Sequence, residues 1–307
     1  MSELLKFKSI TDSLNSVFRT KTKRAEAIRL YEELKKEFDL KGDNLYSALC
    51  SLAISRCEHA KKDYLKEAMT LREAGLNFWR SKFSNKVDLS YPTVSEESTE
   101  AISCFLQAAE LYLQMNKKIK AMKLYNELAI CLKLIGEPRE AAFYFRKAAA
   151  LIQSKNKLSF IQIILESFYC LIDCTDYSKA TNTLFYVINF LKRSLTEKNS
   201  VAFGLQKYLF EAQLNLLLLN LLQRKISDSK EVLKEINELI QTNFWSESEH
   251  TIPANDFYEI LSEIVNFVKE REIEELEILA AEIRTELPKE SNRIMDLLTQ
   301  SLKRFLL

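Results

Sequence analysis

Residues that break helices are scarce in this sequence. It contains four glycines and four prolines among 307 residues, whereas average usage is roughly 7% and 5%. This scarcity leaves little room for β-hairpins or glycine-rich phosphate loops. With two histidines, His59 and His250, no pairing of a histidine base with a nucleophile can be assembled. We therefore expect an all-α protein that is not an enzyme and has no catalytic or cofactor-binding residues.

Long apolar runs are also missing. The longest, Leu214–Leu222, is interrupted by Asn215 and Asn220 and is far shorter than the roughly 20 residues that cross a bilayer. It is better interpreted as a helix buried on most sides. The first residues contain no apolar core like that of a signal peptide. Six cysteines lie within helical patterns, which fits a reducing compartment. These features predict a cytoplasmic protein without direct membrane insertion.

Two patterns that could bind a metal or a nucleic acid are incomplete. Cys170 and Cys174 share a helix face, but no second cysteine or histidine pair at suitable spacing accompanies them, so a core role is preferred and no metal site is expected. The basic cluster from Arg19 to Arg24 lacks the interleaved aromatic residues on which single-stranded nucleic acids stack. We expect no nucleic-acid partner.

Four stretches open a helix in a similar way. They are residues 63–68, 116–121, 136–141 and 175–180, and each joins a turn or capping residue to a charged first turn and an alanine. A small alanine lets a neighbouring helix approach closely, as in the second helix of a tetratricopeptide-type hairpin. Such hairpins cannot bury their apolar faces alone, so they stack into a solenoid that binds other proteins.

The helical periodicity predicts a tetratricopeptide-like α-solenoid of about 14 antiparallel helices. We divide it into tetratricopeptide-like repeats over residues 1–195 and a helical continuation of the same solenoid over residues 196–307. The expected helices span approximately residues 4–19, 23–38, 43–61, 63–84, 95–115, 117–135, 137–154, 157–174, 176–194, 200–223, 227–244, 253–270, 272–287 and 289–305.

Charge is divided unevenly although the total is only +1. Residues 228–290 contain 17 acidic and 6 basic residues, a net charge of −11, and residues 291–307 carry +2, so residues 1–227 carry +10. Opposite patches suggest a partner with complementary charge, while the alternative is that each patch is a solvated helix face. The candidate partner-binding residues are a basic cluster, an apolar connection, an aromatic pair and an acidic cluster: Arg19, Lys21, Lys23, Arg24; Leu89, Tyr91; Phe244, Trp245; Glu270, Glu272, Glu274, Glu275 and Glu277.

Several segments resemble one family. Residues 46–57 read YSALCSLAISRC, residues 129–149 read AICLKLIGEPREAAFYFRKAA, and residues 174–180 read CTDYSKA. In this order they resemble the 40-kDa huntingtin-associated protein family, and residues 244–247 and the helix after Pro253 match it more weakly. The long proline-rich insert associated with vertebrate members is absent, which suggests a compact, invertebrate relative.

The resemblance implies a binding partner that stabilises huntingtin, a very large HEAT-repeat scaffold. It also implies a link to early endosomes and vesicle trafficking through a Rab GTPase, with a nuclear location left open. Two alternatives within the same fold class are an adaptor for SNARE disassembly, similar to soluble NSF attachment protein, and another tetratricopeptide-type scaffold.

Overall fold

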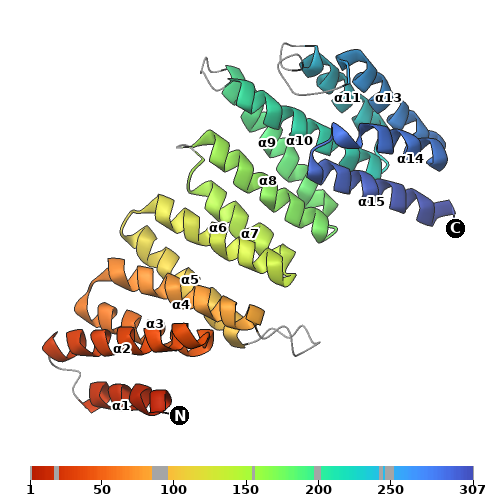
Figure 1. Cartoon of the computed structure of the whole chain (residues 1–307). Coiled ribbons are helices and arrows are strands. Elements are labelled where there is room, and N and C mark those ends of the chain that lie inside the picture. The colour runs from red at the N-terminus through yellow and green to blue at the C-terminus, as the bar shows by residue number, and fades with distance from the viewer. Residues whose placement is uncertain are drawn as a thin grey trace. The chain divides into compact units, whose positions relative to one another are not determined.

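The computed structural model describes residues 2–16, 21–84, 96–153, 156–196, 202–241, 245 and 252–306. Over these residues the chain forms 14 α-helices and one short 3-10 helix, with no strand (Figure 1). The prediction of an all-α fold is therefore confirmed. Most helix boundaries lie within three residues of those expected, because turn and capping residues mark them locally.

The chain divides into two compact units, Met1–Lys155 and Asn156–Leu307. The first contains α1 (Ser2–Ser16), α2 (Lys21–Lys41), α3 (Asn44–Lys61), α4 (Tyr64–Ser84), α5 (Glu96–Gln114), α6 (Lys118–Ile135) and α7 (Pro138–Ala150). The second contains α8 (Lys157–Asp173), α9 (Tyr177–Thr196), α10 (Ala202–Leu222), α11 (Ile226–Ile240), α13 (Ala254–Glu270), α14 (Ile273–Glu282), the 3-10 helix η2 (Ile283–Thr285) and α15 (Lys289–Leu306).

The boundary between the units differs from the division suggested at residues 195/196. Helices α9 and α10, which flank residue 196, pack extensively against each other within the second unit. A helix pair with a shared apolar interface forms one compact body, so the break in composition that the sequence shows there does not separate two units of the structure.

Consecutive helices in each unit pack as antiparallel neighbours, which gives a solenoid-like stack of helical hairpins. One helix departs from this order. Helix α15 returns to pack against α10, although α11, α13, α14 and η2 lie between these two helices in the sequence. Helix α10 is consequently covered on several sides, and every residue from 212 to 220 is buried. This confirms the interpretation of its Leu-rich run, and none of the described helices is long and apolar enough to cross a bilayer.

The same turn joins successive helices at seven places. A residue with positive φ ends the first helix: Gly42, Lys62, Asn116, Gly136, Thr175, Arg224 or Arg271. The N–H of the following residue donates to the carbonyl five positions earlier, for example Asp176 to Leu171 at 3.0 Å. This is the hydrogen bond of a Schellman motif. The carbonyl of Asp176 also accepts from Ala180 at 3.0 Å, so one residue closes one helix and opens the next.

A small side chain follows five positions after the positive-φ residue at most of these turns. Ala121, Ala141 and Ala180 have exposures of 0%, so the alanines identified in the sequence are fully buried, as a close approach of neighbouring helices requires. Ser47 and Ser229 occupy the equivalent position and are also fully buried. Serine is small enough for the same close approach. The sequence pattern, which was defined by alanine, therefore did not identify these two positions.

The fourth sequence stretch, residues 63–68, is one residue out of register with the others. Its positive-φ residue is Lys62, so the position equivalent to Ala180 is Glu67 and not Ala68. Both are buried, and Ala68 has no exposed surface. The helix therefore meets its neighbour through Ala68, one position later than in the other stretches.

Candidate interaction surfaces

Only part of the predicted basic cluster lies within the described residues. Arg19 and the side chain of Lys21 lie outside the described residues, and Lys23 is exposed at the start of α2. The Arg24 guanidinium donates to the carbonyl of Ala60 at 2.7 Å, near the C-terminus of α3. A cation at this end of a helix satisfies a terminal carbonyl and interacts favourably with the helix dipole. Arg24 therefore has a role within the fold.

Of the aromatic and apolar candidates, Trp245 is buried and not exposed as expected. Leu89, Tyr91 and Phe244 lie outside the described residues. The Trp245 side chain is only 7% exposed, and its ring contacts Phe210 and Phe257 with centroids 5.5 and 4.8 Å away. Its indole N–H donates to the carbonyl of Ile252 at 3.0 Å. Trp245 is therefore a core residue of the second unit, because neighbouring helices supply apolar surface that the adjacent polar sequence did not reveal.

The acidic cluster lies on the surface at the junction of α13 and α14. Glu270, Glu272, Glu274, Glu275 and Glu277 are all exposed. Only Glu277 forms an ion pair within the described part of the chain, with Lys303 of α15 at 2.6 Å. Ile278, which is 68% exposed, lies beside these carboxylates. The acidic pattern did not single out this apolar residue, which lies on the exposed side of a short helix whose buried side carries Leu276 and Ala280.

The first unit contains a groove of about 1050 Å³ that is lined mainly by α2, α4 and α6. We call it the α2–α4–α6 groove. Its floor includes the buried side chains of Ile28, Ile54 and Leu124, and the half-exposed Met69 projects into it. Ion pairs cross it: the Arg72 guanidinium donates two hydrogen bonds of 2.7 Å to Glu127, which joins α4 to α6.

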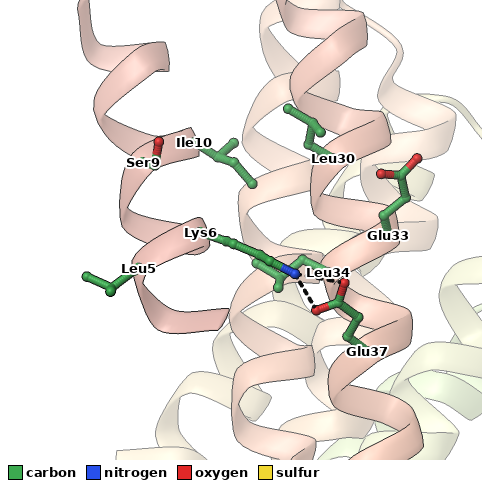
Figure 2. Close-up of a pocket in the computed structure, with 8 residues that line it drawn as sticks. All are labelled: Leu5, Lys6, Ser9, Ile10, Leu30, Glu33, Leu34 and Glu37. Carbon is green, nitrogen blue, oxygen red and sulfur yellow. Dashed lines mark hydrogen bonds and ion pairs between the residues drawn. The ribbon is translucent and has the colours of Figure 1, made fainter. Parts of the chain in front are cut away.

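A smaller groove of about 470 Å³ lies between α1 and α2 (Figure 2). Lys6 of α1 reaches across it to pair with Glu37 of α2 at 3.0 Å, and Ile10 points toward Leu30. Leu5 points away from α2 and is 65% exposed. Helix α1 thus covers part of the α2 surface but leaves an apolar edge of its own in solvent.

Polar contacts join α15 to α8 and α10 in the second unit. The Ser291 hydroxyl donates to the Asn215 carbonyl oxygen of α10 at 2.8 Å, and Arg293 pairs with Asp173 at the end of α8. Nearby, the Tyr169 hydroxyl of α8 donates to the Glu211 carboxylate of α10. Buried polar groups carry a large penalty unless their partners are in place. These contacts therefore specify how α15 docks on α8 and α10.

Burial sets the acidity of three of the thiols. Burial raises the pKa of the Cys50 and Cys104 thiols to about 12 and that of Cys131 to about 11. Thiols with such pKa values stay protonated at neutral pH and are poor nucleophiles. Of the pair assigned to the core in the sequence, Cys170 is fully buried, whereas Cys174 is partly exposed at the end of α8. Across the described ranges, no group of three or more His, Cys, Asp or Glu side chains is arranged to hold a metal ion.

Comparison with known proteins supplies the family relationship. No protein-family model matches the chain. The 40-kDa huntingtin-associated proteins of Rattus norvegicus and Mus musculus are each 30% identical to it over 178 residues, which is 58% of this chain. The chain is a distant relative of these proteins. It spans about half the length of the curated relatives it matches, since the aligned region is 47% of each. The resemblance to the 40-kDa huntingtin-associated protein family noted in the sequence is thereby confirmed, whereas its invertebrate origin stays a prediction.

Proposed function

We propose that this chain is a non-enzymatic binding partner that stabilises a huntingtin-type HEAT-repeat scaffold. The similarity to proteins named for their association with huntingtin carries the proposal. The fold supports it, because stacked helical hairpins present extended surfaces for other proteins. The α2–α4–α6 groove and the acidic cluster provide an uneven, charged surface of this kind.

The cellular setting belongs to the same proposal and rests on the family resemblance. We place the complex in the cytoplasm, with recruitment to early endosomes through a Rab GTPase and a role in vesicle trafficking. Lys23 and the four unpaired glutamates of the acidic cluster are retained as contact residues. Arg24, Trp245 and Glu277 are not, because each is already engaged within the fold.

Affinity purification of the tagged chain from its own cells, followed by mass spectrometry, tests the proposal. We expect a stoichiometric, very large HEAT-repeat protein that stays bound through a high-salt wash, as it would if the interface exceeds the roughly 2,000 Å² of obligate complexes. We also expect the chain to be degraded when the scaffold is depleted. Recovery of SNARE proteins with an AAA ATPase would instead support the attachment-protein alternative. A stable free chain at full cellular abundance after depletion would contradict the stabilising role.

A further inference from the structure

The α2–α4–α6 groove carries more positive charge than its own carboxylates neutralise. Its lining contains six basic and four acidic side chains. Three of the acids already have partners: Glu58 pairs with Lys61 at 2.8 Å, Glu127 with Arg72, and Glu73 with Lys35 of α2. In the described part of the chain, Arg80, Lys120 and Lys123 form no ion pair.

These three cations lie beside apolar surface. Lys120 is placed over the Tyr112 ring, 5.4 Å from its centroid. Met69 is 55% exposed and lines the groove with Leu76, both on α4. An apolar strip flanked by cations suits a ligand that is apolar on one side and acidic at its edges. The volume of the groove is roughly that of a cylinder about 10 Å wide and two to three helical turns long.

The second unit shows how a surface of the same type is covered. Helices α8 and α10 are the first members of their hairpins, as α2, α4 and α6 are of theirs. Helix α15 packs on α10 beside α8, and it buries an apolar stripe made by Ile294, Met295, Leu298 and Leu302 (Figure 1).

Ion pairs flank that apolar stripe. Arg293 and Lys303 of α15 pair with Asp173 of α8 and Glu277 of α14. Two basic side chains of α15 are therefore held by acidic neighbours in the second unit, while its Asp296 pairs with Arg284. Four charged side chains of the α2–α4–α6 groove form no ion pair in the described part of the chain, and three of them are basic while Glu32 is acidic. A helix that complements this groove is therefore mainly acidic.

We propose that the α2–α4–α6 groove binds an acidic amphipathic helix of the scaffold. The apolar face of that helix lies on Met69, Leu76 and Leu124, and its carboxylates pair with Arg80, Lys120 and Lys123. The inference rests on the proposed function, because the scaffold supplies the helix. It assigns the contact to a surface for which the sequence pattern named no residue.

The first test measures the Kd of the immobilised, purified scaffold for the full chain. We expect Lys120→Glu with Lys123→Glu to raise the Kd at least about tenfold, since buried or partly buried charge pairs are lost and replaced by repulsion. The matched control is Arg139→Glu with Arg146→Glu, two exposed cations of α7 outside the groove with the same change of charge. It should change the Kd less than about twofold. Equal effects of the two double variants would overturn the groove assignment, whereas no binding by the unmodified chain would refute the proposed function itself.

A second test does not depend on charge. A photo-crosslinking benzoyl-phenylalanine replaces Met69 in the complex, and a control replaces the exposed Phe143 of α7. We expect Met69 to crosslink to one acidic amphipathic helix of the scaffold and Phe143 not to reach that helix. A crosslink from Met69 to a basic segment, to a non-helical segment or to a second copy of this chain would overturn the proposal. So would the absence of a crosslink in a complex that forms normally.

Discussion

Glu211 shows how one residue depends on its tertiary surroundings. It lies on α10, where burial is the main cause that raises the pKa of its carboxyl above the usual 4.5. The hydroxyl of Tyr169 and the cation of Lys207 favour the charged form, while Glu290 and Glu166 oppose it. Helices α8 and α10 and the start of α15 all contribute to this site. Ionisation of a carboxyl in such a position lowers the stability of the folded chain.

We predict that Glu211→Gln stabilises the chain at neutral pH. The folded state binds more protons than the unfolded chain between the ordinary and the raised pKa, so the free energy of unfolding falls as pH rises above about 4.5. Glutamine keeps an acceptor for Tyr169 and removes this loss. We expect a Tm about 2–4 °C higher at pH 7, which corresponds to roughly 1 kcal/mol for a chain of this size. Thermal melts at a series of pH values measure it.

The control is Glu238→Gln, which changes an exposed carboxylate of α11. It should leave both the Tm and its dependence on pH close to those of the unmodified chain. A Glu211→Gln variant that melts at or below the temperature of the unmodified chain at pH 7 would show that the ionised carboxylate stabilises the fold.

At the scale of elements, the repeated turn sets the spacing of the hairpins. Glycine provides the positive φ at residues 42 and 136, but the other five turns place a residue with a side chain there. Left-handed backbone is unfavourable for such residues by about 1–2 kcal/mol, and most so for a β-branched one. Thr175, with φ of 56°, is the β-branched case. Hydrogen bonds of the Schellman motif on both sides hold it in this conformation.

We predict that Thr175→Gly raises the free energy of unfolding by roughly 0.5–1 kcal/mol. The gain is the strain relieved at positive φ, reduced by the greater freedom of glycine in the unfolded chain. Chemical denaturation measures it. The reciprocal variant, Gly136→Ala, places a side chain at φ of 87° and should lower stability by about 1 kcal/mol. Opposite signs for the two variants are the expected outcome, and a loss of stability in Thr175→Gly would refute the strain argument.

At the scale of the whole molecule, negative charge is concentrated in residues 228–290. The exposed glutamates between α13 and α14 belong to the stretch that carries a net charge of −11. Because Glu277 already pairs with Lys303, the carboxylates available to a partner are Glu270, Glu272, Glu274 and Glu275. Charges at the rim of an interface mainly change the association rate and its dependence on salt.

We predict that reversal of Glu270, Glu274 and Glu275 to lysine slows association with the scaffold and flattens its salt dependence. The effect on the rate should be about tenfold at low ionic strength, and the melting curve should stay the same. Stopped-flow association at several salt concentrations measures both quantities. The control reverses Glu231, Glu238 and Glu259, which are exposed elsewhere in the same acidic segment. If both triple variants associate like the unmodified chain, the acidic cluster is a solvated face that keeps the chain soluble.

The sequence by itself determined the all-α class, most helix boundaries and the burial of Ala121, Ala141 and Ala180. These properties depend on local information: helix propensity, capping residues and the spacing of small and apolar side chains. The 3-10 helix η2 was not predicted, because the helical pattern expected over residues 272–287 runs through Ile283–Thr285 without a break.

Only the tertiary structure decided which surfaces are free. It buried Trp245, engaged Arg24 and Glu277 in contacts within the chain, returned α15 to α10, and formed the α2–α4–α6 groove. Each of these outcomes depends on residues that are distant in sequence, and no local period encodes them. Burial and ion pairing arise when separate helices come together, so a residue's availability to a partner becomes known only once the helices are packed.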